Sequence, residues 1–148
     1  MLALAVKACA GIAAWEAAWW ARRRYRRSTV YQQALAYAHS IDRPLVVIGA
    51  PDSGATSGYG CGDITLDLAL SSCPNSIVAD VTKTIPLAND SCVCFVSCVL
   101  EYVNDHIAAL NEIQRISGGQ IFWVGVEPWT LAAYLYPGAR RTLPSSMR

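Results

Sequence analysis

The chain has 148 residues, of which 53% are hydrophobic and only 16% are charged. This length suits one compact domain, and the high apolar fraction excludes a disordered chain. The formal net charge of +1 excludes a strongly basic nucleic-acid-binding domain, so no nucleic-acid partner is expected. The charge is uneven, because residues 1–27 carry six basic groups against one acidic group, whereas residues 28–148 carry six against ten.

The chain begins with an alanine-rich apolar run, residues 2–21, which is about as long as a bilayer-spanning helix requires, roughly 20 residues. Tryptophans gather at its end, where an aromatic belt would meet the membrane interface, and five arginines follow within residues 22–27. The pattern predicts a membrane anchor, spanning or interfacial. The other interpretations are a helix docked on a protein partner and a cleaved signal peptide.

The anchor prediction divides the chain into an anchor with a basic flank, residues 1–27, and a folded domain, residues 28–148. If the helix spans the bilayer, the positive-inside rule places this domain on the cytoplasmic side of the membrane. The six cysteines agree with that side, because the apolar stretch CVCFVSC predicts buried structural thiols. A zinc site would need a fourth ligand and paired spacing, so no metal is predicted.

The second domain shows an alternating pattern of helical and strand-like segments. Residues 28–43 have helical spacing, with Ser28 or Thr29 as a possible N-cap and Pro44 at the end. Residues 104–116 form the clearest helix, with a cap at Asn104 or Asp105 and a Gly-Gly stop. Five apolar segments are predicted as strands: PLVVIGAP, ITLDLAL, SIVAD, CVCFVSCVL and QIFWVGV. The continuous apolar runs indicate strands buried on both faces, and therefore an α/β fold with about five mostly parallel strands.

One stretch of some forty residues carries an ordered set of motifs. A strand ends in Asp, and a loop with Pro and Asp follows. An apolar strand comes next and ends in Leu-Glu. It is followed by a helix that contains Leu, Glu-Ile and Arg, and then by a Gly-Gly turn. The residues are Asp80, Pro86-Leu87, Asp90-Ser91, Leu100-Glu101, Asp105, Leu110, Glu112-Ile113, Arg115 and Gly118-Gly119. This order resembles small class I S-adenosylmethionine-dependent methyltransferases. The resemblance covers residues 45–126 and implies a minimal Rossmann-like sheet.

The resemblance also implies a cofactor, S-adenosylmethionine, and roles for particular residues, although it assigns no catalytic residue. Gly49 and Gly54 would form the glycine turn beside the cofactor. Asp67 would hold the ribose, and Asp80 would hold the adenine. Ser97, with Cys98, would line the pocket near the methyl group. The alternatives are structural roles without a ligand: Asp67 would be an ordinary carboxylate at the end of a strand, and Asp80 would cap its own loop.

The chain departs from the family pattern in three places. Pro51 stands within the glycine motif, the glycine-rich loop 51–63 has no helical period, and only a short tail follows the fifth strand. These departures predict a degenerate methyltransferase-like domain that serves as a membrane-tethered scaffold or as a subunit of a larger assembly. The alternative is an active methyltransferase that acts on a lipid, a small molecule or a protein near the membrane.

Overall fold

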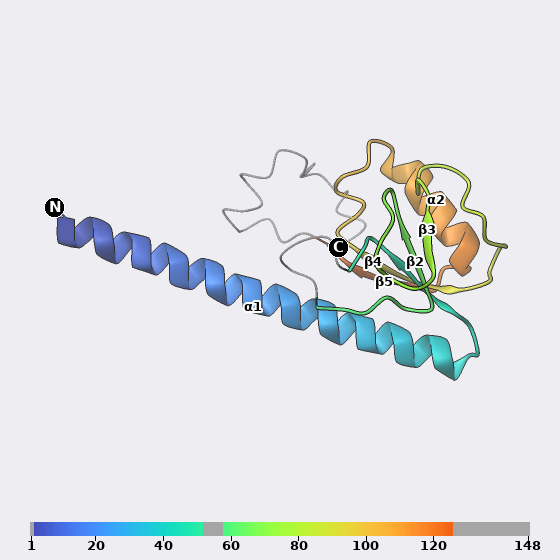
Figure 1. The fold of residues 1–148 in the computed structure, drawn as a ribbon, viewed down its shortest axis with the longest axis horizontal. Coiled ribbons are helices and arrows are strands. Elements are labelled where there is room, and N and C mark those ends of the chain that lie inside the picture. Colours follow the sequence, from blue (N-terminus) through green and yellow to red (C-terminus); the bar gives the residue numbers. More distant parts are fainter. Residues whose placement is uncertain (1, 52–57, 126–148) are drawn as a thin grey trace.

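A computed structural model describes residues 2–51 and 58–125, with side chains from residue 9 onward. A long helix, α1 (Leu2–Ser40), precedes five strands and a second helix (Figure 1). The elements that follow are β1 (Leu45–Ile48), β2 (Ile64–Asp67), β3 (Ser76–Val78), β4 (Val93–Ser97), α2 (His106–Ser117) and β5 (Ile121–Val124). Neighbouring strands are all parallel, in the order β3-β2-β1-β4-β5. The predicted five-stranded parallel α/β fold is confirmed.

Among residues 2–51 and 58–125, the sheet has one helix on each face, α1 on one side and α2 on the other (Figure 1). Every residue of β1 and β4 is buried, as their continuous apolar runs predict. Alternate side chains serve the two faces: Val47 and Phe95 pack with α1, whereas Ile48 and Val96 pack in the core that contains α2. The two central strands therefore connect two separate hydrophobic clusters.

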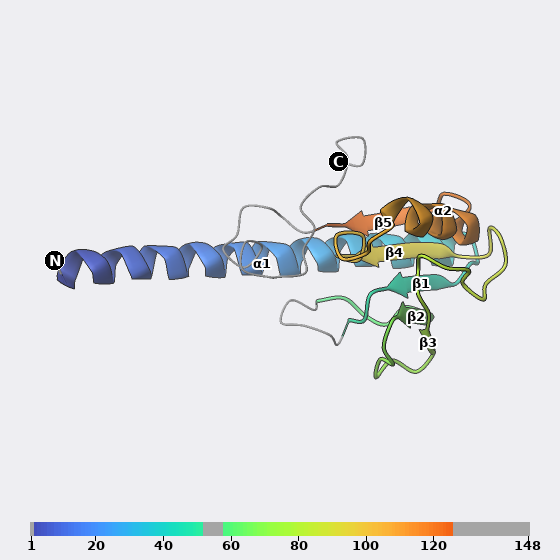
Figure 2. The same ribbon diagram turned by 90° about the horizontal axis from the view of Figure 1, so that it is seen from above.

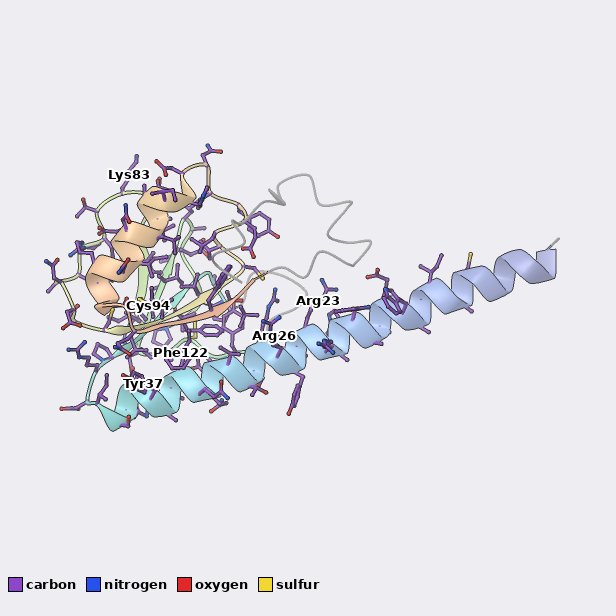
Figure 3. All side chains as sticks on the ribbon, turned by 180° about the vertical axis from the view of Figure 1, so that it is seen from behind. Arg23, Arg26, Tyr37, Lys83, Cys94 and Phe122 are labelled. Carbon is purple, nitrogen blue, oxygen red and sulfur yellow. A yellow bond between two sulfur atoms is a disulfide. The ribbon has the colours of Figure 1, made fainter. Side chains whose placement is uncertain are left out.

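The amino-terminal helix is longer than predicted. The start of a new helix at Ser28 or Thr29 is wrong, because α1 runs without interruption through both residues, and the predicted boundary between residues 27 and 28 falls inside it. The carboxyl-terminal part of α1 buries Ala34 and Ala38 on the sheet. There Tyr37 lies 5.7 Å from the Phe122 ring of β5, between ring centroids (Figure 3). The amino-terminal part extends beyond the sheet (Figure 2).

The second helix has the predicted start and stop. Asp105 is the N-cap, since its Oδ1 accepts a hydrogen bond from the Ala108 amide at 2.9 Å. Gly118 follows the helix in a left-handed conformation, with φ of 59°, which glycine adopts without a steric penalty. A Cβ atom at this position would also meet the exposed Asp90 carboxylate, which would have to move.

The β2–β3 side of the sheet has little cover. The connections 68–75 and 79–92 contain no helix. The predicted strand ITLDLAL ends early, at Asp67, because the Asp67 carboxylate accepts the Ala69 amide and starts a turn. Leu68, Leu70 and Val78 are 69%, 77% and 57% exposed. Apolar side chains are therefore exposed on the edge strand β3 and in the turn after β2.

The cysteines divide into two groups. Cys92 and Cys94 are buried thiols, as predicted. Cys61 and Cys73, which lie outside that apolar stretch, form a disulfide with a Cα–Cα distance of 5.6 Å. The two are brought together because the turn before β3 folds back along β2, where the Thr65 hydroxyl donates to the Cys61 carbonyl at 2.8 Å. Disulfides persist in oxidising compartments, so the cysteines give no support to the cytoplasmic side.

The loop before β4 is clamped to α2 by one arginine. Arg115 donates to both carboxylate oxygens of Glu112, at 2.8 and 2.6 Å, and to the carbonyls of Ile85 and Leu87, each at 3.0 Å. The Glu112 carboxylate in turn accepts the Ile85 amide at 2.6 Å. These bonds satisfy the backbone of a loop that has no secondary structure of its own. The Arg115 guanidinium holds the pKa of Glu112 below its ordinary value.

We expect this clamp to lose its effect in acid. A carboxylate whose pKa is lower in the folded chain than in the unfolded chain stabilises the folded state. The stabilisation is complete at a pH above the pKa of the unfolded chain, about 4.3 for glutamate, and it is lost as the pH falls through the pKa of the folded chain. At pH 7, Glu112→Gln should therefore lower the urea midpoint, and the gap to the wild-type chain should close toward pH 3. Asp42→Asn, which changes an exposed carboxylate after α1, is the control. A gap that stays constant for Glu112→Gln would rule out the clamp.

Candidate cofactor site at the carboxyl edge of the sheet

Three of the predicted site residues meet where the order of the strands reverses. The chain adds β2 and β3 on one side of β1 and then returns to place β4 and β5 on the other. In open parallel sheets, ligands bind outside the carboxyl ends of the strands at such a point. Gly49 follows β1, Asp67 ends β2 and Ser97 ends β4. The register, in which Ile48 pairs with Leu66 and Val96, makes these residues neighbours across the edge.

Gly49 is required by the close approach of β4. Its φ of 95° is one that side chains rarely adopt. An added Cβ atom would lie 2.9 Å from both the Ser97 carbonyl oxygen and the Val99 Cγ2. The glycine therefore allows the backbone beyond β1 to pass close to the end of β4.

Asp67 bonds to the chain itself. Its Oδ2 accepts a hydrogen bond from the Ala50 amide at 2.6 Å, while its Oδ1 accepts a long one, 3.4 Å, from the Ala69 amide. The carboxylate thus fixes the turn that follows β1 from the end of the neighbouring strand. One of the two oxygens predicted to meet a ribose is already used for this purpose.

Tyr59 covers the same edge from the glycine-rich loop. Its hydroxyl lies 3.3 Å from the Gly49 carbonyl oxygen and 3.4 Å from that of Ala50, to which it donates. Its ring packs against Phe95 with a centroid distance of 5.1 Å. Burial raises the pKa of the hydroxyl, which therefore remains a proton donor at neutral pH. The Tyr59 side chain occupies the edge beside Gly49, where the resemblance expects the cofactor.

Arg27 reaches the edge from α1. Its guanidinium donates to the Cys98 Sγ at 2.7 Å, across the end of β4. Cys98 has a left-handed φ of 52°, and its amide donates to the Val124 carbonyl of β5 at 2.9 Å. Burial raises the pKa of the Cys98 thiol, so the group facing Arg27 is a neutral thiol at neutral pH. The contact fastens α1 to the turn after β4.

Ser97 lies at the edge, as predicted, and is buried. Among residues 2–51 and 58–125, its hydroxyl has no hydrogen-bond partner, and the same holds for the buried indole nitrogen of Trp123. The two residues come from adjacent strands but face opposite sides of the sheet, because Val96, next to Ser97, is the register partner of Trp123. They therefore do not form one ligand-binding group.

The two other predicted cofactor residues give less support to a site. Asp80 lies beyond β3 and caps its own turn, since its Oδ1 accepts the Thr82 amide at 2.9 Å and the Thr82 hydroxyl at 2.7 Å. These bonds lower the pKa of Asp80. This is the loop-cap arrangement that the sequence left open. Gly54 lies outside the described residues.

The described residues do not fit S-adenosylmethionine in this conformation. The carboxylates assigned to its ribose and adenine bond to the Ala50 and Thr82 amides, and Tyr59 occupies the glycine turn. The ranges 2–51 and 58–125 also contain no group of three or more His, Cys, Asp or Glu side chains arranged to hold a metal ion. In the same ranges, no helix is both long enough and apolar enough to cross a bilayer.

Tyr59 and Arg27 were missed by the sequence analysis. Tyr59 is an aromatic residue within the glycine-rich loop 51–63, in which only Gly54 was assigned to the site. Arg27 was counted with the basic flank. However, it lies four residues before Tyr31, on the helix face that packs on the sheet, and this spacing is the signal that could have found it.

The chain was compared with known proteins in three ways. No protein-family model matches it, and neither the curated proteins nor the solved structures contain a match.

Proposed function

We propose that the chain is a methyltransferase-like α/β domain that does not bind S-adenosylmethionine and serves as a scaffold or a subunit of a larger assembly, tethered to a membrane through α1. The observation that carries the proposal is the closed carboxyl edge. The Asp67 carboxylate bonds the Ala50 amide at 2.6 Å, and the Tyr59 hydroxyl covers the adjoining carbonyls. A cofactor would have to break these contacts before it could use the same atoms.

A second observation supports the scaffold. Leu68, Leu70 and Val78 are exposed apolar residues at the β2–β3 end of the sheet, where the connection between the two strands contains no helix. Exposed apolar patches of this kind often mark protein–protein contacts. A protein partner that covers these residues would complete the sheet in the way that helices do in larger α/β domains.

The alternative is an active methyltransferase with a substrate near the membrane. It is favoured by one feature: Gly49, Asp67 and Ser97 lie at the strand-order reversal, and the Asp67 Oδ1 accepts only a long hydrogen bond, 3.4 Å. An enzyme would need the Tyr59 loop to open and expose this oxygen to the ribose hydroxyls.

Calorimetric titration of the full chain with S-adenosylmethionine and S-adenosylhomocysteine tests the proposal. We expect no binding up to millimolar ligand. Micromolar binding would contradict the cofactor-free domain. If Asp67→Asn also abolished that binding, the result would favour the enzyme, because the carboxylate would then be a ligand for the ribose. Asp42→Asn removes an exposed carboxylate away from this edge and is the matched control.

The side of the membrane depends on two opposing features. The arginines that follow the apolar run would support the cytoplasmic side only for a spanning helix, whereas among residues 2–51 and 58–125 no helix is long and apolar enough to cross a bilayer. The Cys61–Cys73 disulfide favours an oxidising compartment. The cytoplasmic placement therefore stays a prediction, and the oxidation state of these two cysteines in cells distinguishes the alternatives.

A further inference from the structure

The amino-terminal part of α1 has its own surface chemistry. No residue between positions 9 and 30 is buried, and from residue 9 onward the first buried residue of the helix is Tyr31. Figure 2 shows that this part of α1 continues past the carboxyl edge of the sheet, toward which the strands point. Residues 9–26, called here the projecting segment, thus lie outside the hydrophobic cores.

Large apolar side chains are exposed on the projecting segment. Ile12, Trp15 and Trp20 are 53%, 55% and 41% exposed. Trp15 and Trp19, one helical turn apart, lie with their ring centroids 5.6 Å from each other. Tryptophan prefers the interface of a bilayer, because its ring is apolar and its N–H remains available to a polar partner.

The arginines follow the tryptophans directly and lie against them. The Arg22 guanidinium is 5.4 Å from the Trp19 ring centroid, and that of Arg24 is 5.8 Å from the Trp20 ring centroid. Figure 3 places Arg23 and Arg26 where α1 leaves the body of the protein. The helix therefore changes along its length from apolar to aromatic to cationic, which is the order of the layers from the acyl region of a bilayer to its phosphates.

Of the two parts of the chain, only the amino-terminal one has a net charge that is complementary to an anionic surface. Residues 1–27 carry a formal charge of +5, and residues 28–148 carry −4. An anionic surface attracts the projecting segment and repels the rest of the protein. A nucleic acid would also attract the arginines, but the exposed Ile12 and Trp15 have no role along a phosphate backbone, whereas both fit the apolar side of a lipid interface.

We infer that the projecting segment binds anionic phospholipid at a membrane surface, with its tryptophans at the interface and its arginines on the headgroup phosphates. The inference rests on the tether in the proposed function and names the lipid that the tether recognises. It also sets an orientation. Arg27 bonds Cys98 at the end of β4, so the carboxyl edge of the sheet lies on the side of the protein nearest the bound headgroups.

Vesicle flotation of the full chain tests this inference. We expect the protein to float with vesicles of phosphatidylcholine and phosphatidylserine, and to float much less with phosphatidylcholine alone or in high salt. Arg22→Gln/Arg24→Gln/Arg26→Gln should weaken binding to the anionic vesicles about 100-fold, because each arginine near such a surface contributes about fivefold. The matched control, with lysine at the same three positions, keeps the charge and should keep the binding.

A second variant tests the contribution of the exposed tryptophans to vesicle binding. Trp15→Ala/Trp20→Ala should weaken binding to the anionic vesicles, whereas Leu68→Ala/Leu70→Ala, which removes two exposed apolar side chains of the body, should not. Circular dichroism checks that each variant keeps its helix. Equal binding to neutral and anionic vesicles, loss of binding in the leucine variant alone, or tighter binding to single-stranded RNA than to vesicles would overturn the inference. A positive cofactor titration would overturn the scaffold but leave this result unchanged.

Discussion

Phe95→Ala should lower the free energy of unfolding by about 4 kcal/mol, the largest effect of a single substitution expected for this chain. Phe95 is fully buried at the centre of the sheet, and its ring lies 5.5 Å from that of Tyr31 in α1 and 5.1 Å from that of Tyr59. Its loss leaves a cavity between the sheet, the helix and the loop over the candidate site. Urea unfolding of the full chain, followed by circular dichroism, measures the effect.

Phe122→Ala is the matched control for this prediction. Phe122 packs on the same helix through Tyr37 but lies on the edge strand β5 and is only partly buried. Its removal should cost about 1–2 kcal/mol, since less apolar surface is lost and water can fill the space. Equal losses for the two variants would contradict the placement of Phe95 at the centre of the packing between α1 and the sheet.

Removal of the disulfide should have the next largest effect. Cys61→Ala/Cys73→Ala should destabilise the chain by about 3 kcal/mol, the chain-entropy value for a loop of this length, which spans a sequence separation of 12. The bond joins the end of the loop before β2 to the turn after it, at the β2–β3 end of the sheet, where the connections 68–75 and 79–92 contain no helix. It thus restrains a region with few other tertiary contacts. Urea unfolding with and without reductant measures the loss.

A thiol count tests the bond itself. Alkylation of the unfolded, unreduced chain should modify four cysteines, Cys9, Cys92, Cys94 and Cys98, and reduction should raise the number to all six. Cys9→Ala changes an exposed thiol and is the control, which should leave the stability unchanged. If six thiols react without reduction in protein purified from its native compartment, the disulfide is absent there, and the cytoplasmic prediction gains support.

Much of the sheet could be predicted because its signal is local. The runs around Val47 and Phe95 are apolar at every position, which indicates strands buried on both faces, and Asp105 and Gly118 mark the ends of α2 by their own backbone preferences. Gly49, Asp67 and Ser97 meet at one edge because each follows or ends a parallel strand. Strand ends and helix caps can therefore be predicted from individual residues, because each depends on local sequence.

The missed features depend on partners far apart in the chain. Arg27 contacts Cys98 across 71 positions, a contact that appears only when α1 lies on β4. The continuous α1 was missed because Ser28 and Thr29 look like a cap, although the packing of Tyr31 and Ala34 on the sheet holds the helix through them. The hydrogen bond that Asp67 accepts from the Ala50 amide could also not be predicted from the sequence. A carboxylate at the end of a strand can accept a hydrogen bond from a ligand or from a backbone amide equally well.

The position of β4 between β1 and β5 has a consequence for synthesis of the protein. Chains are made from the amino terminus, so α1 and the first three strands leave the ribosome before β4 exists. Until then, Tyr31 and Ala34 of α1 lack most of their packing surface, and β1 has only one of its two neighbours. The native core therefore forms late, because its contacts join residues that are distant in the sequence. During that interval, the face of α1 that carries Tyr31 and Ala34 is exposed in the nascent chain and must not bind other partners.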